Sequence, residues 1–576
     1  MASWRNSGWL LAATLIIAAL LGFAAAQPPV PQPASAPADR FAAGRAMADV
    51  RIIARVPHVS GSLENTAVRT HLVARLEALG FAVRLAPAAL PAKARKRLSD
   101  WGAANAATAQ AINIVAVRSG RDPVSPAVAI MAHYDSVWAS PGAADDAAGV
   151  AAALEIARAI PRGDQQRDLV LLFTDAEELG LWGAKAFFAP GANGDSLASH
   201  IGVIVNLETR GGGGRAFMFE TGPQAGAMID LYRQTVRQPS TTSMAVKLYQ
   251  LLPNSTDYTP ALKRGIPGFN FAFTGKAALY HSPLATPENL DQDALQHLGS
   301  QGLDITRALV TASTLPPSAP DVVFGDVLGA FTFAYAPVFG WLLLAATAGL
   351  IIVAARARRT DWRWRGLAGG IPGGLVFGIG AAVLLYSGNL LSGADGDVNY
   401  YDRLAALPRL EAQALLLFAA AFAIVVALRP GRRSDWDGWL GLAVLNTLIA
   451  IAVQILLPAA GAIFTLPLLL AALTMAIASR LPRATVPVAM LIAIPALAWL
   501  AGLTHSTLLS IGADVPSIVA VFAPLTLLLL WPLLPRVPRR PALLAALVLT
   551  LAAGSLALWV RLDPIAASVP PYAPRG

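Results

Sequence analysis

The strongest constraint on the fold of this chain is a series of eight apolar runs between residues 332 and 560. Each run is long enough to cross a bilayer as a helix. A chain that is 55% hydrophobic with a mean hydropathy of +0.54 is too apolar for a soluble protein, which favours several membrane spans. The predicted spans lie near residues 332–354, 367–390, 411–428, 438–457, 459–479, 485–503, 515–534 and 541–560.

Arginine residues gather in every second loop between these spans. Excess positive charge on alternate loops is typical of the cytoplasmic side of a membrane. The pattern therefore predicts a cytoplasmic N-terminus, with residues 40–320 on the non-cytoplasmic (periplasmic, extracellular or lumenal) side. It also explains the formal charge of +9 better than a nucleic-acid surface does. The arginines are Arg356, Arg358, Arg359, Arg363 and Arg365, then Arg429, Arg432 and Arg433, then Arg480 and Arg483, and finally Arg536, Arg539 and Arg540.

Composition divides the chain into a globular part and a membrane part. Residues 40–320 hold most of the acidic residues and all but one of the seven histidines. The apolar run 9–26 follows Arg5 and is predicted to be a membrane anchor or, because residues 24–26 resemble a cleavage site, a signal segment. In chain order we expect this segment at 1–26, a linker at 27–39, a globular domain at 40–315, a linker at 316–328, a transmembrane domain of about eight helices at 329–562 and a tail at 563–576.

Five short apolar runs in the globular part are typical of buried strands. Residues 66–79 have helical periodicity that ends at Gly80, and residues 147–160 form a second predicted helix. Alternating strands and helices predict an α/β domain with a mixed, mostly parallel sheet and helices on both faces. Residues 87–109 are predicted to be an irregular surface loop or lid. The predicted strands are 112–117, 128–132, 169–174, 201–207 and 268–273.

Acidic residues and histidines follow one predicted strand after another. In an open α/β sheet the ends of such strands meet at the edge where ligands bind. Two histidines and several acids at that edge suit a pair of divalent metals, which indicates a metallohydrolase. Because the chain has no cysteine, any metal must be held by histidine and carboxylate. The residues are His133, Asp135, Asp145, Asp146, Glu177, Glu178, Glu208, Tyr280 and His281.

Each of these motifs is weak when taken alone. A single His-x-Asp is more often structural, Glu-Glu pairs are mostly solvated, and Asp-Asp before a helix is usually an N-cap. In combination, Asp145 suits a carboxylate that bridges two metals about 3.5–4 Å apart. Asp135 can orient the imidazole of His133. Of Glu177 and Glu178, one can bind metal while the other accepts a proton from water.

The combined pattern resembles the di-zinc aminopeptidase family of metallopeptidase clan MH. The motifs that carry the resemblance are His133-x-Asp135, residues 141–146, residues 177–181, residues 206–208 and Tyr280-His281. An exported domain ahead of many spans resembles the membrane branch of the family, with the endoplasmic reticulum metallopeptidase and the vacuolar membrane protease.

The resemblance implies that residues 40–315 are a zinc peptidase domain with two zinc ions. One ion would be held by His133, Asp145 and Glu208, and the other by Asp145, Glu178 and His281. Glu177 would be the general base, and Tyr280 would stabilise the oxyanion. Two features depart from the family: many soluble members have Asp where Glu208 stands, and residues 254–257 contain no basic oxyanion partner, a role for which Arg210 is one alternative.

The function that these features predict is a membrane-anchored, zinc-dependent exopeptidase, more specifically an aminopeptidase, which acts on peptides beside a lipid bilayer. Three alternatives stay open. A glutaminyl cyclase-like acyltransferase usually has one zinc, which the five-ligand set argues against. An inactive receptor or scaffold would not need both Glu177 and the ligands. A transporter with a peptidase-like sensor needs ionisable groups within its spans. The large polar residues there are Gln413, Asn446 and Gln454, with Asn389 and Glu411 near the edges of their spans.

Overall fold

The computed structural model describes residues 8–191, 195–367, 370–396, 398–428 and 435–562. The predicted tail at 563–576 and the residues Arg5, Arg429, Arg432 and Arg433 lie outside these ranges. The chain divides into an α/β unit, Gln27–Ala334, and a helical unit that combines the N-terminal helix with residues from Tyr335 onward.

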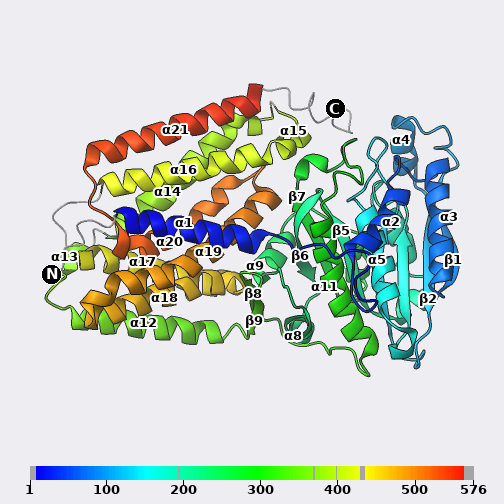
Figure 1. Ribbon diagram of the computed structural model, residues 1–576, viewed down its shortest axis with the longest axis horizontal. Coiled ribbons are helices and arrows are strands. Elements are labelled where there is room, and N and C mark those ends of the chain that lie inside the picture. Colours follow the sequence, from blue (N-terminus) through cyan, green and yellow to red (C-terminus); the bar gives the residue numbers. More distant parts are fainter. Residues whose placement is uncertain (1–7, 192–194, 368–369, 397, 429–434, 563–576) are drawn as a thin grey trace. The chain divides into compact units, whose positions relative to one another are not determined.

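A seven-stranded sheet forms the centre of the α/β unit, in the order β1-β2-β4-β3-β5-β7-β6 (Figure 1). The four strands β4, β3, β5 and β7 are mutually parallel, whereas β2 and β6 run antiparallel to their neighbours. The predicted fold class, a mixed and mostly parallel sheet, is therefore confirmed. The strands are β1 (Ala82–Ala89), β2 (Gln110–Arg118), β3 (Ala127–His133), β4 (Leu169–Thr174), β5 (Ile201–Thr209), β6 (Gly213–Thr221) and β7 (Gly268–Gly275).

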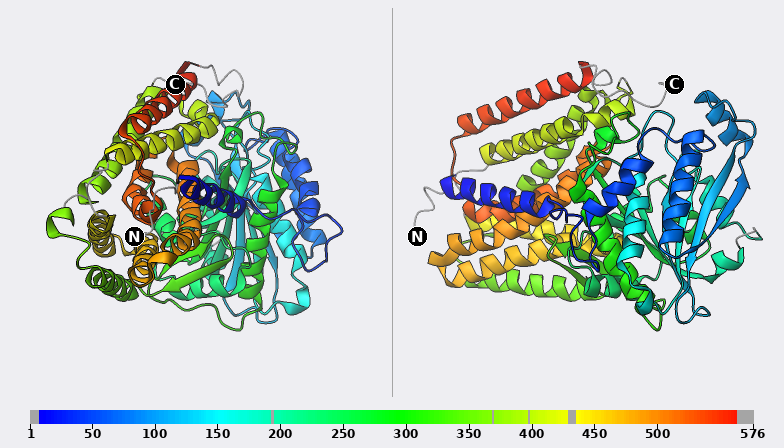
Figure 2. Two further views of the ribbon diagram at one scale, coloured as in Figure 1. Left: turned by 60° about the vertical axis from the view of Figure 1, so that its left-hand side comes forward. Right: turned by 45° about the vertical axis from the view of Figure 1, so that its right-hand side comes forward.

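Helices cover both faces of this sheet (Figure 2). In β3 the side chains of Val128 and Ile130 join the core on one face, whereas those of Ala129 and Met131 join the core on the other. Burial on both faces explains why the central strands are continuous apolar runs. One face packs on α2 (Ala43–Ile53), α3 (Leu63–Ala78), α5 (Ala147–Ala159), α8 (Gly226–Thr235) and α11 (Gln292–Thr311), and the other on α6 (Trp182–Phe187), α7 (Asp195–His200) and α10 (Tyr258–Lys263).

All five predicted strands and both predicted helices are present, but the peripheral elements differ from expectation. Residues 87–109 are not irregular throughout: they contain the end of β1 and the helix α4 (Ala92–Asp100). β1 is an edge strand with a mostly exposed, alternating pattern, and Pro87 is compatible with such an edge position. At the opposite edge, the glycines at 211–214 lead into β6, a strand that the sequence did not predict.

The segment before α2, predicted as a linker at 27–39, is ordered against the α/β unit. The guanidinium of Arg45 donates hydrogen bonds to the carbonyls of Ala34, Ala36 and Arg40, and it pairs with Glu155 at 2.8 Å. The predicted linker at 316–328 likewise contains β8 (Val323–Val327), which pairs with β9 (Phe331–Tyr335). The run predicted as a span at 332–354 therefore begins as the strand β9, and its helix starts only at Phe339.

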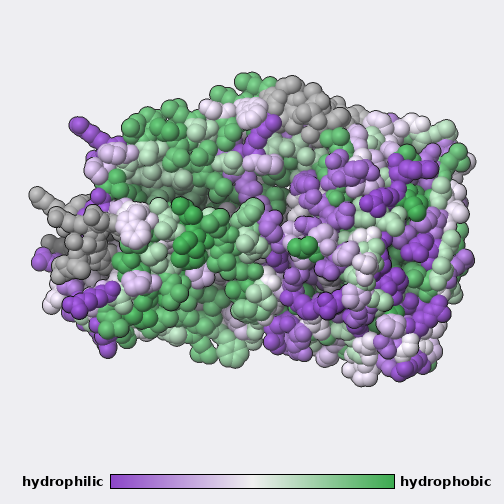
Figure 3. Space-filling view, in the orientation of Figure 1, coloured by the Kyte–Doolittle hydropathy of each residue, from purple (hydrophilic) through white to green (hydrophobic). Residues whose placement is uncertain are grey.

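Nine helical segments among the described residues are long and apolar enough to cross a membrane, as predicted. Apolar side chains cover the face of the helical unit seen in Figure 3. The segments are α1 (Gly8–Ala26), α12 (Phe339–Ala357), Gly370–Ala394 with α14 (Gly370–Asn389), α16 (Leu407–Leu428), α17 (Asp435–Leu456), Pro458–Arg480 with α18, Pro482–Ile511 with α19, Pro516–Leu533 with α20, and α21 (Arg539–Leu562). Small residues let neighbouring helices approach closely. At Gly340 a Cβ would lie only 2.2 Å from the side-chain amide of Gln454, so glycine permits this contact between α12 and α17.

The helix α19 (Thr485–Ile511) extends beyond the span predicted at 485–503. The extension places His505 inside a membrane-capable helix, where its Nδ1 contacts a carboxylate oxygen of Glu411 on α16. The polar residues of the spans are therefore more numerous than the sequence indicated. Nearby, Arg403 is buried and donates to the carbonyls of Ala513 and Ser392, so that it satisfies backbone groups at helix ends.

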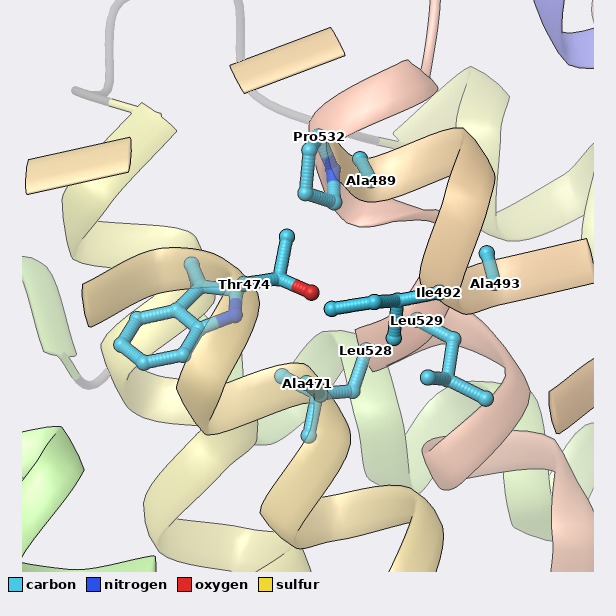
Figure 4. A pocket seen from close by; sticks show the side chains of 9 residues that line it. Ala471, Thr474, Ala489, Ile492, Ala493, Leu528, Leu529 and Pro532 are labelled. Carbon is cyan, nitrogen blue, oxygen red and sulfur yellow. The ribbon is translucent and has the colours of Figure 1, made fainter. Parts of the chain in front are cut away.

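Aliphatic side chains meet where α17, α18, α19 and α20 (Ala523–Leu530) converge. Figure 4 shows Ile492, Leu529 and Pro532 around a small pocket beside Thr474. The hydroxyl of Thr474 donates to the carbonyl of Leu470 at 3.0 Å, so it satisfies its own hydrogen bond within α18 (Gly461–Arg480). The pocket is a packing feature of the bundle.

His297, on α11, is buried in the α/β unit as a neutral imidazole. Its Nδ1 accepts the N–H of Ala216 at 3.0 Å, and its Nε2–H donates to the carbonyl of Gln238 at 2.8 Å. Burial, with the nearby charge of Arg215, lowers the pKa of His297 from 6.5 to about 3. Between these pH values the unfolded chain binds more protons than the folded chain, so this group makes folding less favourable as pH falls through that window.

We expect His297→Gln, which can donate and accept but does not titrate, to weaken the pH dependence of stability. The unfolding temperature of the α/β unit should fall less between about pH 6.5 and pH 4.5 in the variant than in the wild type. The measurement is a thermal unfolding series on the full chain in detergent. The same slope in both proteins would contradict the buried, neutral state of His297.

Candidate metal centre

His133 is the last residue of β3 and is almost fully buried. Its Nε2 lies 3.0 Å from Oδ1 of Asp145 and 3.7 Å from Oε1 of Glu208, at the end of β5. Its Nδ1 lies 3.0 Å from the backbone carbonyl of Asp135. Because β3 and β5 are parallel neighbours, their carboxyl ends bring His133 and Glu208 to the same edge of the sheet.

The local backbone directs Asp145 toward that edge. Gly142 has a φ of +67°, and a Cβ at this position would lie 2.5 Å from the carbonyl oxygen of Asp145. The next residue, Asp146, is the N-cap of α5 and accepts the N–H of Gly149 at 3.1 Å. The second oxygen of the Asp146 carboxylate accepts the N–H of His133 at 3.3 Å. The N-cap therefore also ties the start of α5 to the end of β3.

The second histidine, His281, follows β7. Its Nε2 lies 3.3 Å from Oδ2 of Asp145 and 3.1 Å from Oε2 of Glu178. The two oxygens of Asp145 therefore face different histidines, which is the arrangement predicted for a bridging carboxylate. The ring of Tyr280 stacks on that of His281 with centroids 3.8 Å apart, and the guanidinium of Arg210 lies 5.9 Å from the Tyr280 centroid.

Asp135 fixes the turn that carries the two glutamates. Its Oδ1 accepts the N–H of Glu177 at 3.0 Å, and its Oδ2 accepts the N–H of Glu178 at 3.2 Å. Its Oδ1 also lies 3.5 Å from Nδ1 of His133. The Asp135 carboxylate thus lies beside the imidazole and also holds the backbone of both glutamates, which the sequence did not indicate.

Electrostatics in the cluster follow from burying several acids together. Burial raises the pKa of Glu177 well above its ordinary value, and the charge of His133 opposes this only in part. Burial alone would lower the pKa of His281, but Glu178 and Asp145 raise it to about 10. Burial would raise the pKa of Asp145, yet the two histidines hold it below its ordinary range. The buried carboxylates are therefore stable in their charged form only if positive charge lies between them.

The donor set fits divalent metal ions. His133, Asp145 and Glu208 offer ligand atoms within 4.8 Å of one another, and so do Asp145, Glu178 and His281. Buried Oε1 of Glu178 has no hydrogen-bond partner among the described residues. A buried carboxylate oxygen without a partner is costly unless a cation satisfies it. All eight predicted site residues therefore lie in one region: these five, with Glu177, Asp135 and Tyr280.

Sequence reasoning missed two residues beside this cluster. Asp257 is buried, and its Oδ2 accepts a hydrogen bond from the hydroxyl of Thr174, at the end of β4. Tyr249, at the end of helix α9 (Ser243–Tyr249), packs against Phe219 of β6, and its burial, with the charges of Glu220, Glu208 and Glu177, raises the pKa of its hydroxyl. Asp257 stands in the stretch 254–257, which does not follow any of the predicted strands. No periodicity or motif pointed to Tyr249.

Residues 113–306 match the sequence profile of the peptidase family M28. Endoplasmic reticulum metallopeptidase 1 of Mus musculus is 32% identical over 232 residues, which are 39% of this chain and 25% of that protein. Vacuolar membrane protease of Candida dubliniensis is 30% identical over 289 residues, which are 49% of this chain and 30% of that protein. The chain therefore matches less than a third of the length of either relative.

Two solved structures also align with this chain. A zinc aminopeptidase from Bacillus subtilis is 15% identical with a TM-score of 0.37, and it covers 49% of this chain and 98% of its own. Porphyromonas gingivalis glutaminyl cyclase is 20% identical with a TM-score of 0.35, and it covers 46% of this chain and 97% of its own.

The family profile and the curated relatives confirm the resemblance that the motifs predicted, including that to the membrane branch. The matched stretch contains every residue of the acid and histidine cluster. Residues 113–306 of this chain are therefore similar to peptidase family M28.

Proposed function

We propose that this chain is a membrane-bound, zinc-dependent exopeptidase that removes N-terminal residues from peptides, using two zinc ions. The observation that carries the proposal is the shared carboxylate of Asp145, whose two oxygens face His133 and His281 in two separate triads. A bridging carboxylate flanked by two His-plus-acid sets is what a two-metal hydrolase requires. The named peptidase relatives, and the zinc aminopeptidase among the aligned structures, support this assignment.

The residues that would hold one zinc ion are His133, Asp145 and Glu208, and those for the other are Asp145, Glu178 and His281. Zinc in such a site lowers the pKa of a water and polarises a carbonyl oxygen. The chain itself supplies orientation. Asp135 holds the imidazole of His133 through Nδ1, while the Gly142 turn and the Asp146 cap hold Asp145 at the start of α5.

Glu177 is the proton carrier of the proposed reaction. Its backbone N–H is held by Asp135, and its carboxylate is free of the two metal triads. The buried setting that raises its pKa also favours a group that takes a proton and gives it back. Glu177 takes the proton of the attacking water and delivers it to the nitrogen of the departing amine. Tyr280, held against His281, supplies a hydroxyl beside the reacting carbonyl.

The proposal places the peptidase domain on the non-cytoplasmic side of the membrane. Arginines end or follow the described helices α12, α18 and α20, including Arg356, Arg480 and Arg536, which is typical of cytoplasmic ends. With a cytoplasmic N-terminus, α1 delivers the α/β unit to the opposite side. The lipid bilayer is then the partner of the helical unit, and exported peptides are the substrates.

Metal content provides the first test. The purified full chain should hold close to two zinc ions, and His133→Ala or His281→Ala should each reduce that content by about one ion. Asp145→Ala should disturb both sites, because a bridging carboxylate cannot be lost from one site alone. His200→Ala, on α7 and outside both triads, is the matched control and should keep full content. Full metal content in Asp145→Ala would refute the bridge.

The two adjacent glutamates should separate metal binding from proton transfer. Glu177→Gln keeps size and polarity but removes the base, so turnover should fall about 10²–10⁴-fold while metal is retained. Glu178→Gln should lose metal from one site and activity with it. The measurement is zinc content and peptidase rate for both variants side by side. Full activity in Glu177→Gln would reverse the roles, and zinc-loaded wild type without hydrolysis across a broad peptide panel would favour a scaffold.

Membrane topology is tested with reporter fusions. A reporter after Pro320 and another after Arg359 should report opposite sides of the membrane, because α12 crosses between them. A third fusion after Gly512 should agree with the one after Pro320, since an even number of spans separates those positions. Agreement between the fusions after Pro320 and Arg359 would overturn the nine-span arrangement.

A further inference from the structure

The turn that carries the two glutamates begins with a second buried carboxylate. Asp175 directly follows β4 and is fully buried, and it lies outside both triads. Its Oδ1 accepts the N–H of Ala176 at 2.9 Å, in the same way that Asp135 accepts the N–H groups of the next two residues, Glu177 and Glu178. Two carboxylates therefore hold three successive backbone N–H groups of this turn.

Ala176 has a backbone conformation that needs such support. Its φ is +60°, in the left-handed region that a residue with a Cβ adopts only at a cost in free energy. Its methyl group is buried in an apolar cluster with Leu90, Ala94 and Leu98, which packs the turn against α4. The conformation of Ala176 sets the direction of the chain at Glu177, whose carboxylate is the proposed base.

Asp175 joins this turn to β2 and to the segment before α3, which contribute no residue to the two triads. Its Oδ2 accepts the N–H of Ile112 on β2 at 2.8 Å, and its Oδ1 accepts the hydroxyl of Ser60 at 2.8 Å. The side-chain amide of Asn65, in the first turn of α3, donates to the same Oδ1 at 3.4 Å. Ser60 and Asn65 are buried, so water does not compete for these hydrogen bonds.

The segment before α3 also contacts the turn that contains Asp135. The N–H of His58 donates to the hydroxyl of Ser136 at 2.9 Å, and the N–H of Ser136 donates to the carbonyl of His58 at 3.4 Å. Residues 58–65, which we call the brace, are therefore bonded to Ser136 in one turn and to Asp175 in the other. The brace thus links the two carboxylates that hold the backbone of the glutamates.

We propose that Asp175 is a positioning residue of the peptidase site, which places the carboxylate of Glu177 for proton transfer by fixing the backbone of Ala176 to the brace. The proposal rests on the peptidase function proposed above. Asp175 acts through the backbone, because both of its oxygens accept hydrogen bonds from the protein itself. A general base works only within hydrogen-bond reach of the proton that it takes, so a shift of the turn by about 1 Å lowers the rate without removing a reacting group.

The direct test is Asp175→Asn in the full chain in detergent. The amide keeps the size of the carboxylate but replaces one acceptor with a donor, so that a backbone N–H of Ile112 or Ala176 loses its partner. We expect kcat to fall about 10–10²-fold with little change in KM, because the base is misplaced while substrate binding is not. Zinc content should stay at the wild-type value, since every proposed ligand is kept.

Asp168→Asn is the matched control, at the other end of β4. The carboxylate of Asp168 is also buried, and it also accepts a backbone N–H, that of Gly120 at 2.9 Å. This variant should lower the unfolding temperature but leave kcat unchanged. An equal loss of kcat in both variants would overturn the role of Asp175, because the loss would then follow from general destabilisation.

A second substitution tests whether Asp175 acts through Ala176. Glycine adopts a positive φ without the cost that alanine has. Ala176→Gly alone should therefore leave kcat near the wild-type value, and in combination with Asp175→Asn it should restore most of the lost kcat. A double variant as slow as Asp175→Asn would overturn the route through the Ala176 backbone.

The brace is tested with Ser60→Ala, which removes one donor to Asp175. We expect kcat to fall about fivefold with zinc content retained. The same substitution should have little further effect once Asp175 is already Asn, because both changes break one connection. Additive effects would overturn the role of the brace. If Asp175→Asn does not fold, Ser60→Ala still decides, since a wild-type kcat in that variant would overturn the proposal.

The outcomes distinguish this proposal from the peptidase proposal itself. Wild type that binds zinc but hydrolyses no peptide would overturn both. Active wild type, with Glu177→Gln inactive and Asp175→Asn at the wild-type rate, would overturn the role of Asp175 alone. An Asp175→Asn protein that loses zinc together with activity would also overturn it, because the carboxylate would then support the metal site rather than the base.

Discussion

The structure of the site depends on one carboxylate that contacts two histidines from different strands. Asp145 reaches His133 with one oxygen and His281 with the other, at 3.0 and 3.3 Å. This geometry requires the parallel order β3-β5-β7, because only then do the carboxyl ends of these strands meet at one edge. It also requires the turn at Gly142 and the N-cap at Asp146, which fix where α5 begins. The sheet order, the turn at Gly142 and the N-cap at Asp146 therefore all position Asp145 between the two histidines.

A buried group of acids then shapes the chemistry around that contact. Carboxylates removed from water are stable only with positive charge or hydrogen-bond donors beside them. Asp135 illustrates the use of hydrogen bonds, since it accepts the N–H groups of Glu177 and Glu178. Of these two residues, Glu178 lies in a triad and Glu177 lies outside both triads. Burial also raises the pKa of Glu177, which suits a proton carrier. A single turn thus gives two adjacent glutamates different surroundings.

The peptidase domain also extends further along the chain than its composition indicates. The β8–β9 hairpin lies in a stretch with linker-like residues, yet it is paired to residues 240–242 and bonded to Ser243 at the start of α9. An exposed edge strand such as β6 is a liability unless another segment covers it, and residues 240–242 with the hairpin provide that cover. Most of the hairpin therefore belongs to the α/β unit, although it directly precedes α12 in the sequence.

The sequence by itself determined the central strands, the helix α5, the spans and the identity of the clustered acids and histidines. These are short-range properties: strands buried on both faces are apolar runs, spans are long apolar runs, and polar residues that end such strands stand out. The edge strands β1 and β6, the pairing of His505 with Glu411, and the places of Tyr249 and Asp257 were decided only by the tertiary structure. Edge strands lack a distinctive apolar pattern, and the other features are contacts between residues far apart in sequence, which no local pattern encodes.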